Sequence, residues 1–244
     1  IMSTHIRPSG VFDTQYEQTF MLNRTRFDRF LSNGLLILLL LVPVFVSLGV
    51  LPLSWVGTIN RIAILAIAVQ GLNILVGYTG QISLGHAAFI VVGVYSAAIL
   101  GRAELPFWLV IPAAALITGG VGLLFGLPSL RVKGFYLAMA TLAAQFIIPW
   151  ILKNPLEDLT NGTRALESPA PNLFGNLWTD ESQMFYLIIP VAVVMMLAAR
   201  NIIRTRTGRA LISVRDNDLA AELLGINVFA YKLQAFFLAA FYAG

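Results

Sequence analysis

The sequence contains no cysteine among its 244 residues. This absence excludes disulfides, thiolate metal sites and cysteine nucleophiles, and it leaves the redox compartment undetermined. Charged residues are also scarce: they make up 11% of the chain, whereas a typical soluble domain has about 25%. Because so few charges cannot cover a water-exposed globule, this composition predicts a protein surrounded by lipid.

Several functional motifs are missing as well. The chain has no G-x-x-x-x-G-K-[ST] nucleotide loop and no G-x-G-x-x-G turn, so we do not expect it to hydrolyse ATP by itself. No row of intramembrane Asp or Glu suggests a proton relay. His5, in a polar segment, is the only histidine besides His86, which disfavours a zinc site. We therefore expect no metal and no cofactor, and the small formal charge of +4 does not indicate nucleic-acid binding.

Long apolar runs dominate what is present, since 58% of the residues are hydrophobic. A helix needs about 20 mostly apolar residues to cross a bilayer, and only helices or closed barrels satisfy their backbone inside lipid. The runs cover residues 35–51, 56–76, 82–100, 107–127, 135–152 and 184–199, and a last run at 233–244 begins another span. Because the runs are unbroken, we predict an all-α polytopic transmembrane bundle with six complete spans and the start of a seventh.

Basic residues are unequally divided between the two sides of these predicted spans. With a cytoplasmic N-terminus, 12 of the 16 basic residues lie in cytoplasmic segments and 4 lie outside. The cytoplasmic set is Arg7, Arg24, Arg26, Arg29, Arg131, Lys133, Arg200, Arg204, Arg206, Arg209, Arg215 and Lys232, and the outer set is Arg61, Arg102, Lys153 and Arg164. The positive-inside rule predicts this asymmetry, so we expect a multi-pass protein with its N-terminus in the cytoplasm.

The chain divides into a polar cytoplasmic segment, residues 1–33, and a membrane domain, residues 34–244. The first segment lacks the early apolar core of a cleavable signal peptide. An outer loop, residues 153–183, contains prolines and an Asn-Gly pair, which predict irregular structure with a short helix. A cytoplasmic loop, residues 200–232, is the most charged part of the chain.

The stretch GYTGQISLGHAAF, residues 77–89, combines glycines and hydroxyl groups at a predicted membrane boundary. Glycines permit close approach of backbones or a break in a helix, and a broken helix is tolerated where it lines a cavity. One interpretation is therefore a discontinuous segment that lines a substrate pathway, and the alternative is an ordinary turn before a tightly packed helix. The candidate pathway residues are Gly77, Tyr78, Thr79, Gly80, Gln81, Ser83, Gly85 and His86.

His86 is the only histidine near a predicted span, and an intramembrane ionisable residue is a candidate functional residue. A lone histidine beside a serine and glycines can also hydrogen-bond to a neighbouring helix, and we favour this packing role. A hydrolase based on Ser83 and His86 is disfavoured because no third partner or oxyanion motif accompanies them. Gly122 and Gly126 form a small-xxx-small pattern, which predicts helix packing.

The cytoplasmic stretch 207–227 has leucines and a valine at amphipathic helical spacing. Asp216 or Asp218 can cap a helix start there, and Gly225 fits a helix end. A short amphipathic helix between spans is suited to docking into a groove of a partner protein. The alternative is a helix that lies flat on the lipid headgroups, which the mixture of acidic and basic residues disfavours.

Three stretches, residues 77–89, 131–142 and 208–227, resemble the signature stretches of permease subunits of branched-chain amino acid (hydrophobic amino acid uptake) ABC importers, and among them the LivM-type permeases. The resemblance extends from residue 35 to the end. It implies a transport subunit, not an enzyme, that pairs with a second homologous permease in a bacterial or archaeal cytoplasmic (inner) membrane. Two cytoplasmic ATPase subunits and a periplasmic or extracellular substrate-binding protein would be its other partners.

The resemblance also implies a coupling role for the charged loop. ABC permeases share Glu-Ala-Ala, three residues, then Gly; here Leu219 stands at the Glu position, and acids flank it at Asp218 and Glu222. The coupling set is Arg215, Asp218, Leu219, Ala220, Ala221, Glu222 and Gly225. Family members continue beyond Gly244, so we expect a C-terminally truncated sequence.

Other functions stay open on the sequence alone. Permeases for urea or short amides are relatives of the same family, and the sequence does not distinguish these substrates from branched-chain amino acids. A secondary transporter or channel would need no ATPase. A membrane anchor subunit of a respiratory complex would need a haem or quinone site, and the pair of intramembrane histidines that ligates haem is absent.

Overall fold

The computed structural model describes residues 42, 46, 52, 54–103, 105–127, 134–162, 164, 166, 172–173, 176–178 and 180–244. The polar segment 1–33 and the basic pair Arg131 and Lys133 lie outside these residues, as does the predicted span 35–51 apart from Val42 and Val46. These two valines pack against a hydrophobic cluster formed by α4 and α9.

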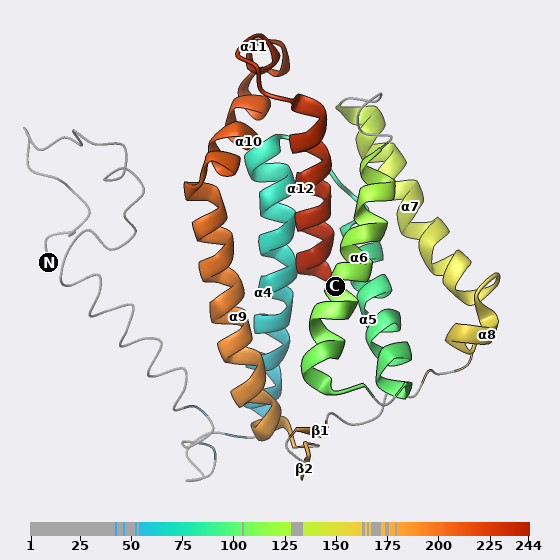
Figure 1. The fold of residues 1–244 in the computed structure, drawn as a ribbon. Helices are drawn as coiled ribbons and strands as arrows, with labels where there is room; N and C mark the ends of the chain where they lie inside the picture. Colours follow the sequence, from blue (N-terminus) through green and yellow to red (C-terminus); the bar gives the residue numbers. More distant parts are fainter. Residues whose placement is uncertain are drawn as a thin grey trace, which may run out of the picture.

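The described chain is a bundle of helices, as the sequence predicts. In order these are α4 (Ser54–Thr79), α5 (His86–Arg102), α6 (Phe107–Gly126), α7 (Phe135–Lys153), α8 (Glu157–Thr160), α9 (Glu181–Arg204), α10 (Arg206–Asp216), α11 (Asp218–Leu223) and α12 (Val228–Ala243). Two short strands, β1 (Asn172–Leu173) and β2 (Asn176–Leu177), pair antiparallel between α8 and α9. Successive long helices run in opposite directions, with α10 and α11 at one end and α8 and the strands at the other (Figure 1).

Four described helices, α4, α6, α7 and α9, are long and apolar enough to cross a membrane. The other two apolar helices, α5 and α12, are shorter, with 17 and 16 residues. Three predicted boundaries are wrong. The third run is not helical from residue 82, because α5 begins at His86; α9 is longer than the run 184–199; and α12 begins at Val228 instead of residue 233.

These errors have local causes. Asn227 caps α12 by accepting a hydrogen bond from the backbone N–H of Ala230 over 3.0 Å, so the helix starts before its apolar run does. Arginine is a good helix former, so α9 continues past its apolar run to Arg204. Hydropathy indicates which residues prefer lipid, whereas the ends of a helix depend on caps and hydrogen bonds.

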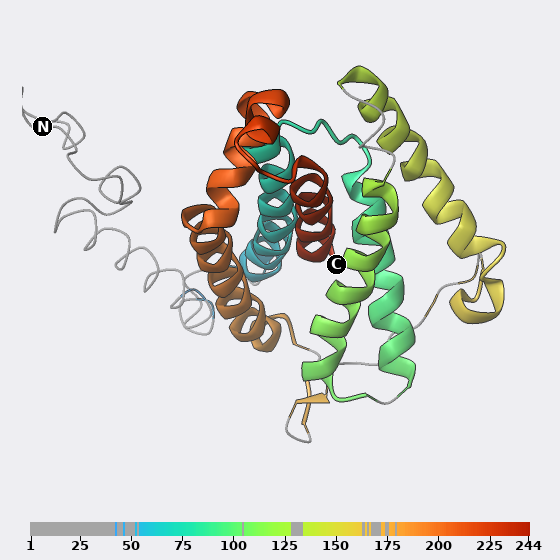
Figure 2. The same ribbon diagram turned by 45° about the horizontal axis from the view of Figure 1, so that its top comes forward.

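Helix α12 lies at the centre of the bundle, between α4 and α6 in both views (Figures 1 and 2). Its Ala235, Phe236 and Ala239 are fully buried. A Cβ atom added at Gly126 would lie 3.0 Å from that of Phe236, and one at Gly122 would overlap Ala240. The predicted packing role of this glycine pair is confirmed, because each glycine of α6 makes room for α12.

Large apolar side chains are exposed on the outer faces of the long helices. On α7, Phe135, Tyr136, Phe146 and Trp150 are each at least 60% exposed. An apolar exterior of this extent is unfavourable in water and typical of a surface in contact with lipid. The described part of the chain is therefore a polytopic membrane bundle.

Candidate functional site

The stretch 77–89 breaks the helical path at one end of the bundle. Helix α4 ends at Thr79, and Gly80 has a φ of +68°, a left-handed conformation that glycine adopts without strain. The chain then runs without helical structure to Gly85, and α5 begins at His86. This interruption fits both interpretations, the discontinuous segment and the turn before a packed helix, so a role in a substrate pathway stays a prediction.

Helix α7 holds this α4–α5 connection in place. The backbone N–H of Leu84 donates to the hydroxyl of Thr141 over 3.0 Å. Gly85 lies so close to the carbonyl oxygen of Thr141 that a Cβ atom there would overlap it. Two of the stretches that carry the family resemblance, 77–89 and 131–142, therefore meet at Thr141.

Helix α10 reaches the same connection from the other side. Nη1 of Arg215 donates to the carbonyl oxygen of Gly77 over 3.0 Å, although 138 positions separate the two residues. A Cβ atom at Gly80 would lie 3.0 Å from Cγ of Arg215. The predicted pathway residues and the predicted coupling residues are therefore in direct contact. We call the group formed by Gly77, Gly80, Gln81 and Arg215 the junction.

Helix α11 follows directly, with a defined cap at each end. Asn217 has an extended backbone, and its Oδ1 accepts from the N–H groups of Leu219 and Ala220 over 3.0 and 3.2 Å. The expectation that Asp216 or Asp218 caps this helix is wrong, because Asn217 occupies the position whose side chain reaches these amides. Gly225, with a φ of +82°, ends the helix as predicted.

Asp218 has a different partner. Its Oδ2 lies 2.6 Å from Nζ of Lys232, and the two side chains are 24% and 10% exposed. This ion pair joins the first residue of α11 to α12. The apolar pattern of the sequence predicts a loop at Lys232 and does not indicate the pair. The signal that could have found it is the N-cap residue Asn227, which places Lys232 inside a helix.

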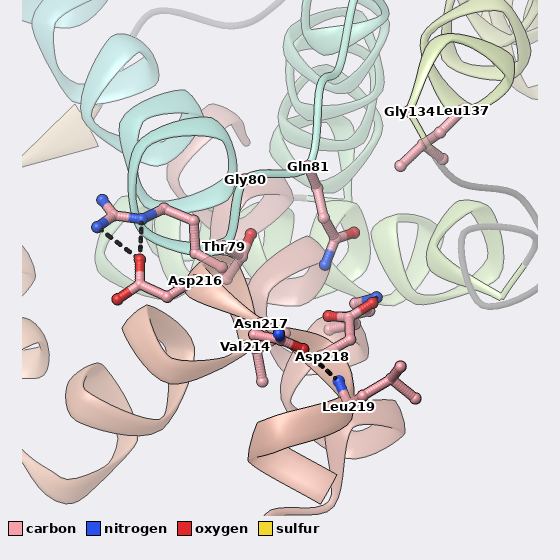
Figure 3. Close-up of a pocket in the computed structure, with 12 residues that line it drawn as sticks. Thr79, Gly80, Gln81, Gly134, Leu137, Val214, Asp216, Asn217, Asp218 and Leu219 are labelled. Atoms are coloured by element: carbon pink, nitrogen blue, oxygen red, sulfur yellow. Dashed lines mark hydrogen bonds and ion pairs between the residues drawn. The ribbon is translucent and has the colours of Figure 1, made fainter.

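A cavity of about 370 Å³ lies beside these groups (Figure 3). Its wall includes Thr79, Gly80, Gln81, Asp218 and Lys232, so it is bordered by α4, the α4–α5 connection, α11 and α12. The Gln81 side chain is only 5% exposed. Neither its Oε1 nor its Nε2 has a hydrogen-bond partner within the part of the chain that the structure describes.

The polar residues after Gln81 have unequal surroundings. Nε2 of His86 lies 2.8 Å from the carbonyl oxygen of Ala68, and its ring meets Phe89 edge-on at 6.1 Å. These contacts support the packing role that we favoured. Nδ1 of His86 and Oγ of Ser83 are buried, and neither has a partner among the described residues. Ser83 is therefore not hydrogen-bonded to His86, as a hydrolase dyad would require.

Two other candidate pathway residues differ from these. Tyr78 lines a separate pocket between α4 and α9, together with Gln70 and Arg200. The hydroxyl of Thr79 donates to the carbonyl oxygen of Leu75 within α4, so it is already satisfied. Among the candidate pathway residues, those with buried polar side-chain atoms that no described residue partners are Gln81, Ser83 and His86.

Leucines form most of the exposed surface of α11 and of the residue that follows it. Leu219, Leu223 and Leu224 are 70%, 90% and 79% exposed, whereas Ala221 is buried. Ala220 and Glu222 are also exposed. These leucines are at the tip of the molecule (Figure 1). Grouped exposed leucines indicate an interaction surface.

Among the described residues, no group of His, Cys, Asp or Glu could hold a metal ion.

Comparisons with known proteins relate this chain to one family. Residues 54–244 match the family described as branched-chain amino acid transport system / permease component. The chain is 33% identical, over 86% of its length, to the high-affinity branched-chain amino acid transport system permease protein LivM of Escherichia coli (strain K12). It is also 33% identical, over 71% of its length, to the LivM protein of Salmonella typhimurium.

The chain spans about half the length of these curated relatives, 54% of the first and 47% of the second. No solved structure matches it.

Proposed function

Because the chain belongs to the branched-chain amino acid transport permease family, we propose that it is a membrane subunit of an ABC importer for branched-chain amino acids. It would form the substrate pathway with a second homologous permease, receive substrate from an external binding protein and be driven by two cytoplasmic ATPase subunits. The observation that carries the proposal is the contact between Arg215 and Gly77, which joins the candidate coupling loop to the candidate pathway.

Helix α11 is the proposed docking element for an ATPase subunit. A groove on the partner would cover Leu219, Leu223 and Leu224, which are otherwise exposed to water. Ala221 is buried against the rest of this chain, and its small side chain lets α11 lie close to the bundle. The departure at Leu219 from the usual Glu fits this apolar contact, and the neighbouring acid Asp218 is turned toward Lys232 instead.

The α4–α5 connection is the proposed part of the pathway. A branched-chain amino acid carries an ammonium group, a carboxylate and an apolar side chain. Gln81, Ser83 and His86 offer buried donors and acceptors that other described residues do not use, and such groups are costly to leave unpaired. These three side chains would therefore offer the substrate hydrogen bonds. None of them carries a permanent charge, which would hold the substrate too tightly for release.

Transport would then follow from movement of α11. When the ATPases bind ATP and close, α11 moves with the groove that holds it. Arg215 passes this movement to the end of α4 through its bond to the carbonyl of Gly77. The α4–α5 connection shifts, and the path alternates between outward and inward access.

The decisive experiment is reconstitution of the complete complex in liposomes. We expect loaded binding protein to stimulate ATP hydrolysis and uptake of labelled leucine, and we expect both to be lost when this permease chain is omitted. Labelled urea is the matched competitor, because permeases for urea and short amides are related. Uptake of urea without leucine would overturn the substrate assignment, and uptake without any bound ATPase would overturn the ABC importer.

A further inference from the structure

We propose that the ion pair between Asp218 and Lys232 is a positioning link that makes α11 and α12 move as one body during transport. The proposal rests on the proposed function and names a second route for the coupling movement. The first route runs from Arg215 to the end of α4; this one runs from Asp218 into the centre of the bundle.

The geometry of the pair is suited to this role. Nζ of Lys232 and Oδ2 of Asp218 are 2.6 Å apart, and both side chains are largely shielded, at 10% and 24% exposure. Water and salt screen such a pair much less than a surface pair. The neighbouring pair between Arg215 and Asp216 is 44% and 62% exposed and joins two consecutive residues, so it connects no separate elements.

The backbone alone leaves α11 weakly attached to α12. Helix α11 has six residues, and Ala221 is its only buried residue. The chain between the two helices turns at Gly225, whose φ is +82°, and a Cβ atom there would meet nothing within 4 Å. The cavity of about 370 Å³ lies against Asp218 and Lys232. Without the ion pair, α11 has both a pivot and adjacent space, so it could tilt while α12 stays in place.

Helix α12 is the element through which a movement would spread farthest. Its Phe236 and Ala239 are fully buried. A Cβ atom at Gly71 of α4 would lie 2.7 Å from the carbonyl oxygen of Ala239. Gly122 of α6 lies against Ala240 of α12. Such close packing leaves no room for α12 to shift alone, so a pull on Lys232 would reach α4 and α6 together.

The test is a double-mutant cycle in the reconstituted complex. The variants are Asp218→Asn, Lys232→Met and the two combined, with Lys232→Arg as the conservative change. Asp158→Asn is the matched control, since it makes the same change at an exposed carboxylate of α8, at the other end of the bundle. The measurements are copurification of the ATPases, thermal stability, basal ATP hydrolysis, and leucine taken up per ATP hydrolysed.

We expect each single neutral variant to lower uptake per ATP about tenfold, which lies within the usual range of coupling between sites. The double variant leaves no unpaired buried charge, so it should recover thermal stability and assembly but not coupling. Lys232→Arg should retain coupling because it keeps the charge and reaches Asp218. Asp158→Asn should behave as the parent complex.

Parent-like uptake per ATP in the double variant would overturn the link, because the pair would then serve stability alone. A parent complex with no stimulation by loaded binding protein would instead overturn the proposed function, and the link with it. The two failures are therefore distinguished by the parent complex.

Discussion

Glycine is required at two positions of the α4–α5 connection. Gly85 faces the carbonyl oxygen of Thr141 without space for a side chain, and Gly80 has a positive φ beside Arg215. Gly120 of α6 is different, because a Cβ atom there would meet nothing within 4 Å. These positions allow a comparison of two glycine-to-alanine substitutions in one protein.

We expect Gly85→Ala to destabilise the bundle. The added methyl group must push the α4–α5 connection away from α7, and overpacking of this kind costs about 1–3 kcal/mol. Gly120→Ala should be neutral or slightly stabilising, because alanine favours a helix and the space is open. Thermal unfolding of the purified complex measures both changes. Equal stability of the two variants would show that Gly85 does not pack against Thr141 as described.

Arg215 should matter more for coupling than for stability. Its guanidinium group bridges the carbonyl of Gly77 and the carboxylate of Asp216 at an exposed position. Arg215→Lys keeps the charge but loses the planar set of donors that serves both partners. We expect a stability loss below about 1 kcal/mol, as for other exposed pairs, together with lower leucine uptake per ATP. If Arg215→Lys took up as much leucine per ATP hydrolysed as the parent complex, Arg215 would not carry the movement from α11 to α4.

At the scale of elements, α11 depends on its ends. A six-residue helix is not stable by itself in water. Here the Asn217 side chain satisfies two N–H groups at the start. At the other end, the N–H groups of Gly225 and Ile226 donate to the carbonyls of Glu222 and Ala221 over 2.9 and 3.0 Å. These caps present the leucines as a fixed surface instead of a mobile loop.

We expect Leu223→Ser to weaken ATPase binding without unfolding the permease. Leu223 is 90% exposed, so its loss removes little packing from the permease itself, whereas a buried leucine at an interface contributes about 1.5–3 kcal/mol. Leu159→Ser is the matched control, because Leu159 is 58% exposed at the other end of the bundle. Copurification of the ATPases should fall for Leu223→Ser alone. An equal effect of both variants would contradict docking at α11.

The sequence predicted the elements better than it predicted their contacts. Apolar runs located α4, α6 and α7 nearly to their ends because lipid selects apolar residues over the whole length of a span. The start of α5 and the extent of α9 depend on glycine conformation and local hydrogen bonds, which hydropathy does not report. The cap Asn217 was missed because its two acidic neighbours have equally suitable side chains.

The site was predicted as two separate sets of residues, and the structure brings them together. No local pattern in the sequence links Gly77 to Arg215, because 138 positions separate them and the contact depends on how α10 packs against α4. Lys232 was missed because a lysine beside an apolar run is ordinarily a membrane anchor. Its partner, Asp218, lies across a turn that only the folded chain closes.

At the scale of the whole molecule, alternation of the helices determines which segments share an end. The end of α4, the starts of α7 and α12, and the helices α10 and α11 all lie at one end of the bundle (Figure 1). The opposite end carries α8 and the strand pair. Docking of a cytoplasmic ATPase at α11 therefore requires the first end to be cytoplasmic, as the charge distribution predicts.

Single-cysteine labelling tests this orientation directly, because the parent sequence has no cysteine and gives no background. Glu222 on α11 and Asp158 on α8 are exposed acidic residues at opposite ends of the bundle. A membrane-impermeant maleimide should label Asp158→Cys in intact spheroplasts and Glu222→Cys only in inverted vesicles, since the reagent does not cross the bilayer. The reverse pattern would place α11 outside the cell. An ATPase that uses cytoplasmic ATP could not then reach Leu223, and the coupling role of the junction would be excluded together with the proposed orientation.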